Sequence, residues 1–142
     1  MHAPSFICQG DVRAAAILTT SYVASIAIPQ AISDSVENTL GDFNVLRVDL
    51  DFTKGNLTSA QLKIETSPDG VNWYQTCSES ISAGVVTSSV EEWTWSANFS
   101  GTIYRTIAAR YARVSVKGIG TVTGSSMRLI ASYGNKQIAN HA

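Results

Sequence analysis

The stretch from Gln61 to Tyr74 restricts the fold more than any other part of the chain. Its first half alternates apolar Leu62 and Ile64 with charged side chains, which is the period-2 pattern of a strand with one buried face. The turn sequence Ser67-Pro68-Asp69-Gly70 follows, with a proline that presets the bend and a glycine that accepts a positive φ. After the turn, the large side chains of Val71, Trp73 and Tyr74 indicate a second strand. This order predicts a β-hairpin.

Similar alternation recurs along the rest of the chain. It predicts further strands at residues 22–28, 43–52, 90–95, 102–108, 111–117 and 126–133. Polar or small residues predict a loop over 30–42, a turn at Lys54-Gly55-Asn56, a loop or ragged edge over 78–89 and a flexible reversal over 118–125. About seven to nine strands and no helix of ordinary length predict an all-β fold, an antiparallel β-sandwich of jelly-roll or Ig-like type.

Two of these strands have the clearest buried faces. In the strand over 43–52 the predicted core residues are Leu46, Val48, Leu50 and Phe52, and in the strand over 126–133 they are Met127, Leu129, Ala131 and Tyr133. The intervening residues of the first strand, Arg47, Asp49 and Asp51, are expected on the solvated face.

A length of 142 residues suits one domain. We expect an N-terminal arm over residues 1–20, the β-sandwich over 21–134 and a loose C-terminal tail over 135–142. Asp11 to Leu18 could form two helical turns, although short isolated helices are marginal. The arm is expected to become ordered against a neighbour or along the edge of the domain.

The charges are few and unevenly distributed. Charged residues make up 15% of the chain and the net charge is −1, which gives no electrostatic reason to expect a nucleic acid or an anionic membrane as partner. All eleven acids lie within residues 1–92, whereas residues 93–142 hold six bases and no acid. Either the late strands pair with the early ones across the sheet, or a basic face docks onto an acidic partner.

No set of residues predicts catalysis or metal binding. Asp49 and Asp51 share an exposed strand face, and nothing near them or near Glu91 and Glu92 would tune one carboxyl into an acid. The histidines, His2 and His141, lie at the extreme ends, outside any metal-ligand spacing or nucleophile motif. We therefore expect no catalytic residue, no metal and no cofactor, and a protein that is not an enzyme.

The aromatic and sulfur residues leave alternatives open. Trp73, Trp93 and Trp95 could fill the core, form a subunit interface or provide a sugar-stacking platform. Cys8 and Cys77 are expected to be free, partly buried thiols in a reducing compartment. The start of the chain lacks a basic segment followed by an apolar run, and no stretch reaches the length of a membrane span, so we expect synthesis in the cytoplasm.

Two short motifs together resemble known families. Residues Ser67 to Trp73 resemble the S-x-D-G-x-x-W hairpin, and residues Ala109 to Val114 resemble an a-R-Y-x-R-v strand. The pairing, which spans residues 43–134, is similar to that of galactose-binding-like (discoidin-type) jelly rolls and of small β-sandwich virion proteins of tailed bacteriophages. Without a leader, a partner domain or long aromatic loops, the chain looks more like the phage proteins. That resemblance implies self-assembly and attachment to a capsid or tail lattice, without catalysis.

We therefore expect a virion protein, made in the host cytoplasm, that acts as a capsid decoration (cement) protein. It would self-associate as a homo-oligomer and bind the major capsid protein or other virion proteins. A head–tail connector or tail protein and a carbohydrate-binding module are the alternatives. The candidate contact residues are the apolar set Phe6, Ile7, Val12, Ile17 and Leu18 of the arm and the basic set Arg105, Arg110, Arg113 and Arg128 of the late strands.

Overall fold

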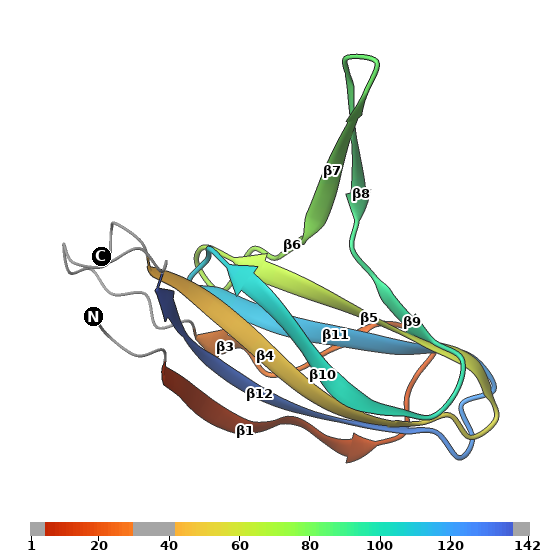
Figure 1. The fold of residues 1–142 in the computed structure, drawn as a ribbon. Helices are drawn as coiled ribbons and strands as arrows, with labels where there is room; N and C mark the ends of the chain where they lie inside the picture. The colour runs from red at the N-terminus through yellow and green to blue at the C-terminus, as the bar shows by residue number, and fades with distance from the viewer. Residues whose placement is uncertain (1–4, 30–41, 138–142) are drawn as a thin grey trace.

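In a computed structural model, two antiparallel β-sheets pack face to face, and a separate two-stranded hairpin projects from one edge (Figure 1). The structure describes residues 5–29 and 42–137. Every regular element within these residues is a strand, and every pairing between them is antiparallel. The predicted all-β sandwich is therefore confirmed. The twelve strands of the described part exceed the predicted seven to nine because several are only two or three residues long.

Sheet A contains four long strands. In spatial order they are β1 (Ser5–Ala16), β12 (Ser126–Gln137), β4 (Asp42–Thr53) and β10 (Phe99–Ile107). Period-2 alternation directs one row of β4 and one row of β12 into the core, as the sequence predicted. These buried residues are Leu46, Val48, Leu50, Phe52, Met127, Leu129 and Ala131, and Tyr133 is partly buried against them.

Sheet B is built on two long central strands, β5 (Leu57–Ser67) and β11 (Tyr111–Gly120). Short strands line both outer edges: β2 (Val23–Ala24) and β3 (Ile28–Pro29) pair with β11, whereas β6 (Tyr74–Gln75) and β9 (Trp93–Trp95) pair with β5. Between β6 and β9 the chain leaves the sandwich as the hairpin of β7 (Cys77–Ser82) and β8 (Val85–Val90).

One core lies between the two sheets, because consecutive long strands alternate between them. The connections from β4 to β5, β10 to β11 and β11 to β12 all cross from one sheet to the other. The first of these is the predicted turn at residues 54–56. Gly55 has a φ of +56°, and a Cβ there would lie 2.3 Å from the carbonyl carbon of Gly124, so only glycine fits.

Where the structure describes it, the predicted N-terminal arm is ordered along the edge of the domain, one of the two expected placements, but as a strand of sheet A. Residues 5–16 form β1, which pairs with β12 along its length, and no helical turn forms. Three register shifts interrupt this pairing, so the apolar residues of β1 do not follow a clean period of two. Val12 and Leu18 are buried in the core. The predicted tail also starts late, because β12 continues to Gln137; residues 138–142 lie outside the described part.

Other boundaries differ in detail. The predicted strand over 22–28 is divided into β2 and β3, and residues 118–120 belong to β11. The predicted reversal after Ser67 is confirmed, but its second strand is only the two residues of β6. The loop expected over 30–42 falls almost wholly outside the described residues. The interval 78–89, predicted as a loop or ragged edge, is instead the projecting hairpin.

Candidate functional site

The β7–β8 hairpin is the part of the fold that contributes least to the sandwich core. It extends away from both sheets, and all twelve of its strand side chains are exposed (Figure 1). Isolated two-stranded hairpins are at best marginally stable in water. An element of this kind gains stability when another surface covers it, so it is the first candidate for a contact site.

The register gives the hairpin two chemically different faces. Ile81 pairs with Val86 and Cys77 pairs with Val90, so these four side chains lie on one face with Glu79 and Ser88 between them. We call this the apolar face. The opposite face, which we call the serine face, carries Ser78, Ser80, Ser82, Val85, Thr87 and Ser89. Ile81 and Val86 are 74% and 58% exposed, so the apolar face is open to water.

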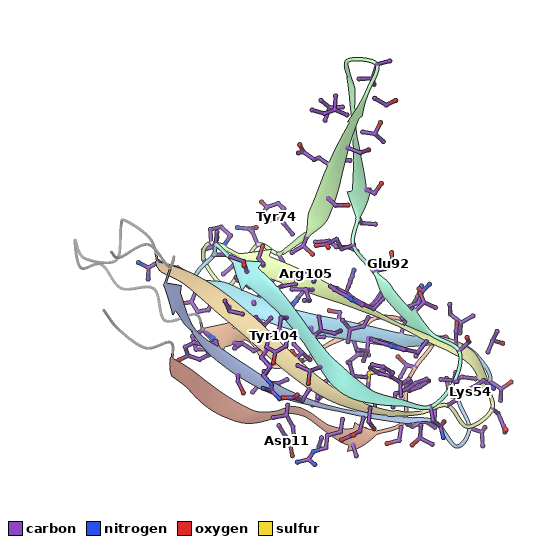
Figure 2. The ribbon with its side chains drawn as sticks, in the orientation of Figure 1. Asp11, Lys54, Tyr74, Glu92, Tyr104 and Arg105 are labelled. Carbon is purple, nitrogen blue, oxygen red and sulfur yellow. The ribbon has the colours of Figure 1, made fainter. Side chains whose placement is uncertain are left out.

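The root of the hairpin, at Thr76 and Glu91, is in contrast hydrogen-bonded to the sandwich. The Glu91 amide donates to the Thr76 carbonyl at 3.0 Å, and the Thr76 amide donates to the Ile64 carbonyl of β5 at 3.1 Å. Arg105 of β10 adds an ion pair to the Glu91 carboxylate at 3.2 Å. Its guanidinium carbon also lies 4.7 Å from the centre of the Trp93 ring. Figure 2 shows Tyr74, Glu92 and Arg105 gathered at this root, below the projecting strands.

The tip closes in a two-residue turn. Ala83 and Gly84 both have positive φ, +51° and +79° respectively, as a type I′ turn requires. This turn matches the right-handed twist of two paired strands, so the hairpin is regular up to its end. A tied root and a regular tip present the apolar face in a defined position.

On the outer face of sheet A, polar side chains form hydrogen bonds and an ion pair with one another. Arg47 donates to Asp49 at 2.9 Å, and the Thr102 hydroxyl also donates to this carboxylate. The hydrogen bond from Arg47 is the main reason that the pKa of Asp49 is lowered. Asp51 accepts a hydrogen bond from Ser100 at 2.8 Å. Asp49 is therefore held as an ionised acceptor, which is unsuited to a general acid, and the Asp51 carboxylate is engaged by a hydroxyl group.

The outer face of sheet B holds a denser polar cluster around Glu65. Burial of this carboxyl would raise its pKa, but hydrogen bonds from Ser115 at 2.7 Å and Arg113 at 3.1 Å outweigh burial and lower it. Arg113 also covers the Trp73 ring at 4.3 Å.

At the β2 side of the same face, the ammonium groups of Lys63 and Lys117 lie 4.3 and 4.9 Å from the centre of the Tyr22 ring. The Tyr22 hydroxyl is buried, and burial is the main cause that raises its pKa, followed by the Glu92 carboxylate.

The basic candidate residues are mostly engaged within the molecule. Arg105 pairs with Glu91, Arg113 with Glu65, and Arg128 with Asp11 at 2.7 Å, each pair joining a late strand to an early segment. The intramolecular interpretation of the uneven charge is the one these three pairs support. Arg110 is exposed, and within the described residues it takes part in no ion pair. A partner-binding role for the four arginines stays a prediction.

The apolar candidate residues are not brought together. Val12 and Leu18 are core residues, whereas Ile17 is 52% exposed. The backbone of Phe6 and Ile7 pairs with Gly134 and Tyr133 in sheet A, and the side chains of these two residues lie outside the described part. Because Val12 and Leu18 pack inside the sandwich, they cannot serve as docking contacts in the folded protein.

The tryptophans have at least one ring face occupied. Trp93 and Trp95 pack partly against the core, and Trp95 stacks on Phe99 with ring centres 5.2 Å apart. Trp73 and Trp93 are each covered by an arginine, as described above. These contacts favour the structural interpretation of the tryptophans over an open sugar platform.

The described sulfur and potential metal-binding side chains are not gathered into a site. Cys77 is a free thiol, as predicted, but it is exposed at the start of β7 and not partly buried. In the described ranges 5–29 and 42–137, no three His, Cys, Asp or Glu side chains are grouped to hold a metal ion. Over the same ranges, no helix has the length and apolarity needed to cross a membrane.

Comparison with known proteins supports the fold. No protein-family model matches the chain, and no curated protein matches its sequence. Among solved structures, the PBSX exported protein XepA is similar, with a TM-score of 0.50 and 9% identity over 97% of this chain and 39% of XepA. At this identity the likeness shows the fold alone, and the chain spans about two fifths of the length of XepA. The TNF Eiger from S. frugiperda, at a TM-score of 0.30 and 8% identity over 94% of this chain and 96% of its own, is too distant to support an argument.

Proposed function

We propose that this chain is a structural protein of a bacteriophage particle, and more specifically a capsid decoration (cement) protein. It would associate with copies of itself and with major capsid subunits, so that many modest contacts together stabilise the shell. In this proposal the protein binds surfaces and carries out no reaction. A head–tail connector or tail position is the alternative placement within the particle.

The observation that carries this proposal is the exposed, two-faced hairpin on a rigid root. A soluble monomer gains nothing from holding Ile81 and Val86 in water on a projecting element, whereas an assembly subunit gains a contact from them. The fold likeness to XepA of the phage PBSX supports the phage setting. The internally satisfied charges of both outer faces support a role without acid–base chemistry.

The number of copies per particle tests this proposal. Purified particles of the phage that encodes the chain are analysed by quantitative mass spectrometry against their major capsid protein. A decoration protein gives a copy number comparable to that of the capsid subunits or to their symmetry-related sites. A connector or tail protein gives one or a few rings per particle. Absence of the chain from washed particles contradicts both placements.

A second candidate follows from the name of the structural neighbour. XepA is described as an exported protein, so a phage product released from the cell is the competing function. The same experiment separates the two, because a released protein accumulates in the particle-free medium. Full recovery of the chain from that fraction would favour export and would overturn the virion proposal.

A further inference from the structure

Two short strands, β6 and β9, follow one another along the same edge of β5. β6 pairs with β5 at Glu65 and Thr66, and β9 pairs with it from Ala60 to Leu62, both in the antiparallel direction. Figure 1 shows the hairpin of β7 and β8 leaving the sheet between them, and this hairpin forms a two-stranded sheet of its own. The edge of sheet B beside β5 is therefore interrupted by the hairpin.

The registers of the two pairings differ by the length of this interruption. Gln75 of β6 faces Glu65, and Trp93 of β9 faces Leu62. Three positions along β5 thus correspond to eighteen positions along the facing chain. A continuous strand needs one residue for each position, so fifteen residues are in excess.

Thr76 shows which fifteen residues these are. Its amide donates to the carbonyl of Ile64 at 3.1 Å, which extends the register of β6 by one residue beyond Gln75. The residues in excess are therefore 77–91, the hairpin together with its last root residue. The next residue along the chain, Glu92, directly precedes β9.

The alternation of faces also continues across the interruption. Gln75 of β6 and Thr94 of β9 both face residues of β5 that lie on the outer face of sheet B. A continuous strand would place Glu92 on this outer face as well. Burial and then the Glu92 carboxylate raise the pKa of Tyr22, whose ring lies 4.3 Å from the ammonium of Lys63 on the same face. Glu92 therefore already lies where a continuous strand would hold it.

The two ends of the excess segment lie next to each other. Cys77 pairs with Val90, and the Glu91 amide donates to the Thr76 carbonyl at 3.0 Å, so the pairing of the hairpin continues down to the sandwich. Facing residues of an antiparallel pair have Cα atoms about 5 Å apart, and one peptide unit spans about 3.8 Å. A small shift of the backbone is therefore enough to join Thr76 directly to Glu92.

We infer that residues 77–91 are an insertion into one edge strand of a sandwich that is complete without them. A β-bulge adds an extra residue to a strand without ending its pairing, and this insertion does the same on a larger scale. Without it, β6 and β9 form one strand that pairs with β5 in a single register. The inference goes beyond the proposed function, because it assigns folding and contact to different residues. It holds whichever surface the hairpin touches.

Excision in and out of register tests the inference. One variant lacks residues 77–91, and the matched control lacks residues 77–90. The control keeps one residue more, which turns the side chains of β9 to the opposite face of the sheet. Both are compared with the full chain carrying Glu91→Gln, because excision of 77–91 also removes the ion pair from Arg105 to Glu91.

Thermal melts followed by circular dichroism measure the result. The variant without residues 77–91 is expected to melt within about 4 °C of the reference chain, and the control at least about 8 °C below it. A larger loss in the first variant shows that the hairpin supports the fold, and equal melting temperatures show that the two strands do not share a register. Either result overturns the inference. Neither bears on the proposed function, because the copy number on particles is measured with the unaltered chain.

Hydrogen exchange of the unaltered chain provides a second, independent readout. An insertion that lies outside the fold opens locally, without unfolding of the sandwich. The hydrogen-bonded amides of β7 and β8 are therefore expected to exchange at least about tenfold faster than those of the central strand β5. Equal protection of the hairpin and of β5 would show that the two unfold together, and would contradict the inference.

Discussion

At the scale of single residues, two neighbours of the same type can differ in burial and therefore in what they contribute to stability. Ile17 and Leu18 are adjacent aliphatic residues, but Ile17 is 52% exposed and Leu18 is fully buried. The Leu18 amide also donates to the hydroxyl of Ser125, which ties this segment to the turn before β12. The side chain of Leu18 is therefore part of the sandwich core, although its position in the chain suggested a docking contact in an N-terminal arm.

Truncation of these two side chains is expected to have very different effects. Leu18→Ala leaves a cavity in the core and should lower the free energy of unfolding by about 2–5 kcal/mol. Ile17→Ala removes an exposed side chain and should change it by less than about 0.5 kcal/mol. Urea denaturation of the two variants measures both values. Equal small effects would mean that Leu18 is not packed in the core.

Asp69 illustrates how a turn residue links stability to pH. Its carboxylate accepts hydrogen bonds from the amides of Asn72 and Val71, both at 2.8 Å, and these lower its pKa well below the ordinary value of 3.8. In the unfolded chain, the Asp69 carboxylate takes up a proton at a pH near its ordinary pKa. In the folded chain, it does so only at a lower pH. The stabilisation from Asp69 is therefore complete above that ordinary value and is lost as the pH falls toward the lowered pKa.

Asp69→Asn should therefore make the melting temperature less dependent on pH in acid. The variant melts at a lower temperature than the wild type at neutral pH, and the difference narrows as the pH falls from about 6 to about 2. Asp51→Asn is the matched control, because Asp51 accepts a hydroxyl hydrogen bond on an exposed face and lies outside any turn. Thermal melts followed by circular dichroism across this range provide the measurement. A gap between wild type and Asp69→Asn that widened in acid would contradict this assignment.

At the scale of elements, the hairpin and the sandwich are energetically separate. The root is closed by hydrogen bonds at Thr76 and Glu91, and none of the strand side chains beyond it is buried. Replacement of residues 78–89 by two glycines should therefore change the free energy of unfolding by less than about 0.5 kcal/mol. Urea denaturation checks this. A loss of more than about 2 kcal/mol would show that the hairpin supports the core.

Much of the element pattern could be predicted from the sequence, for a physical reason. From Leu46 to Thr53 in β4 and from Ser126 to Ser132 in β12, buried residues alternate with partly or fully exposed ones, so the period of two is visible in the residue types. β1 could not be found in this way, because its three register shifts break the alternation. The hairpin was missed because serine occupies every second position of β7, and serine is not a residue that favours strands.

The candidate site was harder to predict than the fold. The apolar set named from the sequence included Val12 and Leu18. Only the pairing of β1 with β12 and the hydrogen bond from the Leu18 amide to Ser125 show that they belong to the core. The basic set was a reasonable docking surface until three of its four arginines were found in intramolecular pairs. Strand order and register decide which arginine pairs with which carboxylate. That order cannot be read from a single sequence.

At the scale of the whole molecule, the fold separates a stable body from an exposed contact element. Polar groups on both outer faces of the sandwich pair with one another, and the hairpin carries four of the exposed aliphatic residues, Ile81, Val85, Val86 and Val90. This arrangement suits a subunit that is held by several weak contacts at once. Avidity on a shell multiplies contacts that would be weak between two free chains.

The most direct test of this account is the binding of the chain to empty shells of its phage. Cosedimentation compares the full chain with the variant in which two glycines replace residues 78–89. The account predicts that the full chain saturates the shells at a fixed ratio to the capsid subunits. The shortened chain, although folded, should bind at least about tenfold more weakly. Equal binding by the two chains, or no binding by the full chain, would contradict it.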